Sequence, residues 1–291
     1  MSLFNTSVLM SGADYFSNAQ PINPYYAEEP VDLDLAQKEH ANIKKMLEQA
    51  GIQIIQVAPP ADSQDGVYTA NWALVRGDKA VLARLPNARK AEEDYAEKIL
   101  TELGKQVVRV PENYKFSGQG DALPCGNYLF CGSGYRSDVE AQAFASDHLG
   151  FERIQLQTIP QLDAHDQPQT NASSGWEDSY FYDIDLALAI IKPPVGGDKG
   201  LIAYCPEAFT PESQQILADF DGVDKIIVSL HEAKDAFATN LVSTGETVVM
   251  SAHAPQLAAE LRAHDIQVLS PEIHELAKGG GYIRCTTLTL T

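Results

Sequence analysis

The most constraining feature of this sequence is a unit of strand, hairpin turn, strand, helix and strand that recurs five times. Short β-prone runs alternate with amphipathic stretches, and Gly77-Asp78 and Gly126-Asn127 mark turns between neighbouring strands. The pattern predicts helices over about 33–50, 90–103, 139–149, 211–219 and 255–263. A polar residue heads the first strand of four units, at separations of 50, 64 and 55 residues: Asn71, Asp121, Asp185 and Asn240.

Recurring supersecondary units of this size predict a closed array around a central axis. We therefore expect an α/β fold, a five-bladed α/β propeller of pseudo-symmetric ββαβ units around a central site, in a single domain over 1–291. The approximate units are 1–60, 61–111, 112–160, 176–230 and 231–291. A doubly wound sheet would explain the alternation of strands and helices, but it would not explain the hairpin in each unit. In a closed array, the polar residues that head the first strands converge on one cavity.

The C-terminal stretch supplies a candidate nucleophile. Three glycines at 279–281 precede Cys285, and an alternating Thr/Leu run with strand composition follows it. A lone cysteine is more often an inert core residue, so Cys285 needs support from the rest of the chain. Asp121, Asp185 and Asn71 supply that support, because together they form an acceptor-rich pocket. Such a pocket suits a guanidinium group, which presents five N–H donors in one plane.

The composition limits the classes of partner that the protein could bind. The chain has 21 Lys+Arg against 40 Asp+Glu and a net charge of −19, which disfavours nucleic acid and anionic membranes but tolerates a small cationic substrate. The four cysteines show neither a CxxC pair nor the Cys/His spacing of zinc sites. The first residues lack the pattern of a signal peptide, and no apolar run is long enough to span a bilayer. We therefore expect a reduced, cytoplasmic protein.

Several short motifs, taken in order along nearly the whole chain, resemble the guanidine-modifying superfamily of arginine deiminases, dimethylarginine dimethylaminohydrolases and amidinotransferases. The motifs are Ile22–Pro24, DGVYTAN at 65–71, Arg89 with Glu92, GQGDAL at 118–123, GYRS at 134–137, YCPEAF at 204–209 and the terminal GGG at 279–281 with Cys285. The resemblance implies a five-bladed ββαβ propeller with a catalytic cysteine near the C-terminus.

The resemblance also implies roles for individual residues. Cys285 takes the position of the nucleophile, and Asp185 and Asn71 take positions that bind the guanidino group. Arg136, with Arg89 as a second candidate, lies near the carboxylate end of the substrate. Asp121 is similar to a structural residue beside the site, and we count it among the binding candidates. We assign no metal and no cofactor, and we expect a small cationic guanidino substrate, with a homodimer as a candidate assembly.

Two positions depart from the family pattern. Asp183 stands where the family carries its general acid/base histidine, and Ser117 stands where it carries the acid that pairs with this histidine. The loss of a positioned general acid/base costs about 10²–10⁴ in rate. Asp183 could replace the histidine if burial keeps it protonated, because it could then donate a proton. A charged Asp183 would instead disfavour the thiolate of Cys285.

Two main hypotheses follow. The first is a cysteine-dependent hydrolase, or amidinotransferase, that attacks the guanidino carbon of arginine-like or methylarginine-like compounds and passes through a covalent thiouronium. The alternative is a catalytically impaired family member that binds a guanidino or amino-acid ligand without efficient turnover. Two weaker hypotheses are that His231 replaces the missing acid/base, and that Asp183 and Asp185 bind a divalent cation.

Overall fold

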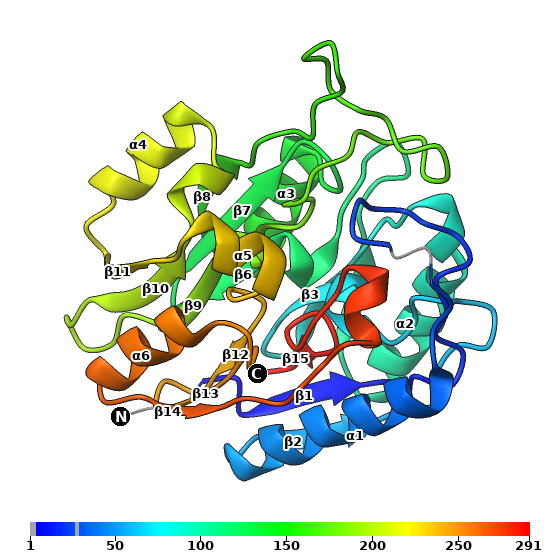
Figure 1. Ribbon diagram of the computed structural model, residues 1–291, viewed down its shortest axis with the longest axis horizontal. Helices are drawn as coiled ribbons and strands as arrows, with labels where there is room; N and C mark the ends of the chain where they lie inside the picture. Colours follow the sequence, from blue (N-terminus) through cyan, green and yellow to red (C-terminus); the bar gives the residue numbers. More distant parts are fainter. Residues whose placement is uncertain (1–3, 27–28) are drawn as a thin grey trace.

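The computed structural model describes residues 4–26 and 29–291 (Figure 1). The main helices are α1 (Leu33–Gln49), α2 (Ala91–Glu102), α3 (Val139–Leu149), α4 (Pro211–Asp219), α5 (Leu230–Ala236) and α6 (Pro255–Ala263). The strands are β1 (Ser7–Met10), β2 (Gln53–Gln56), β3 (Ala73–Arg76), β4 (Lys79–Leu82), β5 (Gln106–Arg109), β6 (Ala122–Cys125), β7 (Tyr128–Ser133), β8 (Glu152–Gln157), β9 (Leu188–Lys192), β10 (Gly200–Tyr204), β11 (Val223–Ile227), β12 (Val242–Ser243), β13 (Thr247–Val249), β14 (Gln267–Leu269) and β15 (Leu288–Thr289).

Within the described residues these strands form five three-stranded sheets, ordered β15-β1-β2, β3-β4-β5, β6-β7-β8, β9-β10-β11 and β12-β13-β14. In every sheet the middle strand pairs antiparallel with one neighbour and parallel with the other. A helix connects the middle strand to its parallel partner. The sheets therefore fit the predicted ββαβ repeat. Helices α1, α2, α4 and α6 lie toward the outside of the view in Figure 1.

Local sequence explains the elements. Helix α1 begins after Asp32, whose side chain accepts a hydrogen bond from Leu35 N at 3.0 Å, and the left-handed Gly51 follows its end. Ile43 and Leu47, one turn apart, are fully buried on one face. Each such side chain contributes about 1.5–3 kcal/mol relative to an exposed position. The predicted helix therefore forms because its apolar stripe faces the sheets.

The predicted hairpin turns are confirmed. In the β3–β4 pair Arg76 lies opposite Lys79, and in the β6–β7 pair Cys125 lies opposite Tyr128, so that two residues form each turn. The first turn residue is Gly77 in one hairpin and the equivalent glycine at 126 in the other. Both have a positive φ, which glycine adopts without steric cost.

The structure differs from the sequence prediction at the starts of the first strands. Asn71 and Asp185 lie within short 3₁₀ turns, η1 (Thr69–Trp72) and η4 (Ile184–Leu186), and Asp121 directly follows η3 (Gly118–Gly120). Asn71 and Asp185 therefore lie in a short turn before their strands, whereas Asp121 directly precedes β6 as predicted. Periodicity marked the strands but carried no signal for a single i→i+3 turn.

The C-terminal strand also differs from the prediction. Cys285 lies in a turn, and β15 begins three residues later. This strand pairs with β1, so residues from both ends of the chain share one sheet. In Figure 1 the C-terminus, in red, lies near the middle of the view. No helix within 4–26 and 29–291 has the length and apolar character that crossing a bilayer requires.

Candidate active site

The thiol of Cys285 is held by an amide and a carboxyl from different units. Asn240 Nδ2 donates to Sγ at 3.1 Å, and Asn240 Oδ1 accepts from the backbone N of Cys285, also at 3.1 Å. Sγ in turn lies 3.5 Å from Asp185 Oδ2, to which the thiol donates. Only 2% of Cys285 is exposed. One asparagine therefore fixes both the backbone and the sulfur of the candidate nucleophile.

Three buried carboxyl groups, those of Asp121, Asp183 and Asp185, lie on turns that contact one another. The 3₁₀ turn η3 contacts both η1 and η4. The backbone N of Ile184 donates to Asp121 Oδ1 at 3.0 Å. One oxygen of each carboxyl has no hydrogen-bond partner among the described residues. Buried acceptors are normally paired, so this cluster is suited to a ligand that brings several N–H donors.

Burial and mutual repulsion set the ionisation of these groups. Burial raises the pKa of Asp185 well above its usual range, and the negative charge of Asp183 raises it further. Burial also raises the pKa of the Cys285 thiol well above its usual range, and Asp185 adds to this effect. Both effects favour the neutral thiol over the thiolate at this position.

The two residues that depart from the family pattern meet at Asn71. Asn71 Nδ2 donates to Ser117 Oγ at 2.9 Å and to Asp183 Oδ2 at 2.7 Å. Burial raises the pKa of Asp183, while Arg136 and the hydrogen bonds from Ser117 and Asn71 lower it. A Cβ at Gly120 would lie 2.5 Å from Asp183 Oδ2, so this packing requires a glycine. Ser117 and Asp183 thus form one hydrogen-bonded group.

The two predicted arginines differ in the groups that they contact. Arg89 uses Nε and Nη2 on Glu92, at 2.8 and 2.6 Å, and Nη1 on Asn71 Oδ1 at 2.7 Å. All of its nitrogens are thus engaged, which leaves it a positioning role toward Asn71. Arg136 Nη2 donates to Ile22 O at 2.5 Å, and its guanidinium lies 4.6 Å from the ring centre of Tyr182.

A narrow cavity of about 10 Å³ adjoins Cys285, and Asn71, Arg89 and Arg136 also line it. The glycine segment, residues 279–281, forms part of its wall. Three side chains bind carbonyl groups in and just before this segment: Asn23 on Gly279, Tyr182 on Gly280 and Tyr68 on Leu276. A larger cavity of about 260 Å³ is lined by Asp185 together with Gln119 and Arg284.

The structure therefore brings together Cys285, Asp185, Asp183, Asn71 and Ser117, with Asp121 behind them and both arginines at the cavity. Asn240 was not among the predicted site residues, although its place in the polar repeat was a usable signal. Tyr68 and Tyr182, which bind carbonyl groups just before and within the glycine segment, were not predicted either.

Neither weaker hypothesis gains support from the structure. His231 lies on the surface with 80% of its side chain exposed, and its Nδ1 is 2.9 Å from Asp235 Oδ2 in the same helix. It is therefore wrong as a replacement acid/base. Asp183 and Asp185 belong to no group of three metal-type ligands in the described part of the chain.

Comparisons with known proteins give a consistent relationship. No protein-family model matches the chain. An N(G),N(G)-dimethylarginine dimethylaminohydrolase of Mycobacterium tuberculosis is 30% identical over 283 residues, which is 97% of this chain and 84% of that protein. A bifunctional arginine dihydrolase/ornithine cyclodeaminase of Nostoc is 27% identical over 97% of this chain, which spans only 37% of its length.

Solved structures agree. The N-terminal domain of a cyanobacterial arginine dihydrolase, a cysteine-to-serine variant bound to its substrate, has a TM-score of 0.85 at 26% identity and covers 98% of both chains. The DDAH of Pseudomonas aeruginosa, at 16% identity and a TM-score of 0.75 over 98% of this chain and 99% of its own, shares the fold. The chain thus belongs to the guanidine-modifying (amidinotransferase) superfamily that contains the dimethylarginine dimethylaminohydrolases and the arginine dihydrolases.

Proposed function

We propose that this protein is a cysteine-dependent hydrolase that acts on the guanidino carbon of arginine-like or methylarginine-like compounds. The observation that carries the proposal is the 3.5 Å contact between Cys285 Sγ and Asp185 Oδ2. It lies in a buried site where three carboxyl groups each keep one oxygen without a hydrogen-bond partner within residues 4–26 and 29–291. The relatives named for dimethylarginine and arginine hydrolysis support the same substrate class.

The proposal includes a closed arrangement of the five sheets as blades of one α/β propeller, in a single domain. Pairing of β15 with β1 joins the two ends of the chain in one blade and supports closure. Contacts of β9 with both β6 and β12 support the adjacency of the third, fourth and fifth blades. Such closure would place Asn71, Asp121, Asp185 and Asn240 around the axis.

The substrate would bring a positive charge next to the buried carboxyl groups. Its guanidinium N–H groups would donate to the unpaired oxygens of Asp185 and Asp183, and its carboxylate would lie toward Arg136. A cation beside the sulfur favours the thiolate and therefore opposes the effect of burial on the pKa of Cys285. Activation of the nucleophile would then depend on substrate binding.

The reaction would proceed in two displacements. The thiolate forms a C–S bond to the guanidino carbon, and the tetrahedral adduct breaks a C–N bond as the leaving amine takes a proton. Asp183, if protonated, is placed by Asn71 and Ser117 to supply that proton. Water then attacks the thiouronium carbon and the C–S bond breaks, which yields a ureido product, ammonia or an alkylamine, and the regenerated thiol. An amine in place of water would give amidino transfer.

The test is release of ureido product and amine from arginine and from methylarginines. Wild-type protein should turn over at least one of them, and Cys285→Ala should not. Cys205→Ser is the matched control, because it changes another buried thiol, which lies next to Glu207 and not beside Asp185. Turnover retained in Cys285→Ala would refute the assignment.

The alternative is a family member that binds its ligand without efficient turnover. The hydrogen-bonded group of Ser117, Asn71 and Asp183 favours this alternative. In that group, serine and aspartate stand where the family carries an acid and the histidine that pairs with it. Ser117→Glu combined with Asp183→His should then raise hydrolysis by about 10²–10⁴. Robust wild-type turnover, not increased by this double change, would reject the alternative.

A further inference from the structure

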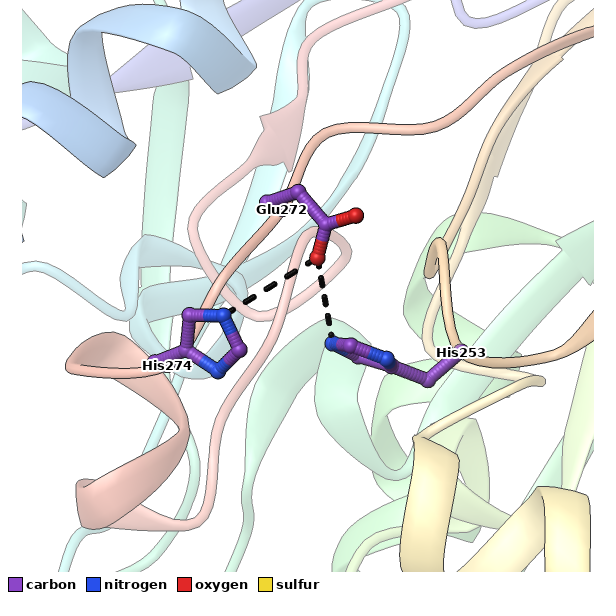
Figure 2. Close-up of side chains that lie close together, drawn as sticks. All are labelled: His253, Glu272 and His274. Atoms are coloured by element: carbon purple, nitrogen blue, oxygen red, sulfur yellow. Dashed lines mark ion pairs between the residues drawn. The ribbon is translucent and has the colours of Figure 1, made fainter.

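A group of metal-type ligands lies outside the site described above, on the surface of the last unit. His253, just before α6, faces Glu272 and His274, which follow β14 (Figure 2). His253 Nε2 is 3.3 Å from Glu272 Oε2, and His274 Nε2 is 3.9 Å from the same oxygen. The three ligand atoms all lie within 4.8 Å of one another. Two imidazoles thus point at one carboxylate oxygen.

One of these distances matches the ligand spacing of a metal-centred arrangement. Zinc binds histidine nitrogen and carboxylate oxygen at about 2.0–2.2 Å, so two ligands of a tetrahedral site lie about 3.4 Å apart. The His253–Glu272 pair already has this spacing, whereas His274 Nε2 would have to move closer to Glu272 Oε2. Two histidines and one carboxylate leave a position for water, as three-ligand zinc sites do. The net charge of −19 also favours a cation at the surface.

The backbone that carries the ligands is anchored. Glu39 of α1, which is only 5% exposed, accepts hydrogen bonds from the backbone N of His274 at 2.7 Å and of Glu275 at 2.9 Å. The backbone N of His253 donates to Ser251 Oγ at 3.2 Å. Metal sites bind well when their ligands are positioned in advance, and these bonds position both ligand segments.

We propose that His253, Glu272 and His274 form a site for a divalent transition metal of the zinc class. Imidazole ligands select such metals over Mg²⁺ and Ca²⁺, which prefer oxygen donors. The sequence motifs did not indicate this site, because eighteen residues, including helix α6, lie between His253 and Glu272.

A metal bound at this site would affect the segment that leads to the active-site cavity. Ile273, between two ligands, accepts a hydrogen bond at 3.3 Å from the hydroxyl of Tyr282, three residues before Cys285. The same stretch continues through η6 (Leu276–Gly279) into the glycine segment beside the active-site cavity. A metal that joins His253 to this stretch would therefore restrain residues 271–280.

Calorimetric titration of zinc chloride into full-length Cys285→Ala protein tests the site without competition from the candidate nucleophile. One zinc should bind per chain, and magnesium chloride should neither bind there nor displace it. Loss of one ligand should cost at least the roughly tenfold typical of perturbed metal sites, so His253→Ala and His274→Ala should each weaken binding by that factor or more. His231→Ala, which removes an exposed surface histidine paired with Asp235, should leave binding unchanged.

Zinc binding of equal affinity in the double variant His253→Ala/His274→Ala, or no saturable binding in Cys285→Ala protein, would overturn the proposal. Amide hydrogen exchange tests the structural consequence separately. Bound zinc should slow exchange over residues 271–280 in Cys285→Ala protein and should have no such effect in the double variant. Unchanged exchange at saturating zinc would show that the metal does not restrain the glycine segment.

Discussion

Two buried charged clusters lie side by side in this protein. They differ in whether each carboxylate oxygen has a hydrogen-bond partner among the described residues. In the Arg89–Glu92 pair both Glu92 oxygens are occupied, Oε2 by Arg89 at 2.6 Å and by Trp72 Nε1 at 2.9 Å, and Oε1 by Arg89 Nε and Ser63. In the group of Asp121, Asp183 and Asp185, each carboxyl keeps one oxygen without a partner among the described residues. Both clusters are buried, yet only the first is complete without a ligand.

This difference separates a structural role from a binding role. A buried ion pair is tolerated when charge and hydrogen bonds are satisfied within the protein. Three adjacent buried carboxyls are destabilising when ionised. Burial raises the pKa of each of them, and the charges of Arg136 on Asp183 and of Arg284 on Asp185 oppose this rise. Such a cost is typical of sites where binding or chemistry requires it.

The largest expected effect is a loss of stability when the Arg89–Glu92 pair is broken. Glu92→Gln leaves the Arg89 guanidinium buried without its counter-charge, and the free energy of unfolding should fall by about 3–5 kcal/mol. Urea denaturation measures this fall. The control is Glu102→Gln on the same helix, which removes an exposed pair with Lys98 at 4.0 Å and should change stability by less than about 0.5 kcal/mol. Equal effects of the two changes would contradict the structural role of Glu92.

A mutation in the group of Asp121, Asp183 and Asp185 should have the opposite effect on stability. Asp185→Asn removes a carboxyl whose pKa burial raises, so the free energy of unfolding at neutral pH should not fall. The same change removes a charge-assisted hydrogen bond to a guanidinium, worth about 1.5–3 kcal/mol, and should weaken arginine binding about 10–100-fold. Calorimetry in the Cys285→Ala background and urea denaturation give the two values. A marked loss of stability with unchanged ligand affinity would reverse the assigned roles.

A smaller effect, about tenfold for each pH unit, is expected in the reactivity of the thiol. Because burial and Asp185 raise the pKa of Cys285, inactivation by iodoacetamide should still be rising at pH 9. Asp185→Asn should shift this profile to lower pH. The raised pKa also contributes stability that is present below about pH 8.5, the value of an unfolded thiol, and is lost as pH rises through the folded value. A plateau of reactivity below pH 8 in the wild type would contradict this account.

Much of the fold could be predicted because periodicity and turn residues report directly on local structure. The helix at 139–149 has the predicted bounds, and Gly77 forms the predicted hairpin turn. Helix α5 was missed, although Ser229 and Glu232 have the spacing of a capping box and Ser229 Oγ accepts from Glu232 N. A seven-residue helix is too short for apolar periodicity to reveal.

The candidate site was predictable only in part. Repetition marked Asn71, Asp121, Asp185 and Asn240, and the glycine run marked Cys285. Partners depend on side-chain directions that no spacing encodes, so the complete engagement of Arg89 by Glu92 became visible only in three dimensions. The same holds for His253 and His274 of the last unit, whose approach to Glu272 no spacing in the sequence indicates.

The most direct test of the central claim is intact-protein mass spectrometry after acid quench during turnover of arginine or a methylarginine. The account predicts a covalent adduct whose mass equals that of the substrate without its leaving amine, located on Cys285 and absent in Cys285→Ala. Product formation with no such adduct in wild-type protein, or with an adduct on another residue, would contradict it.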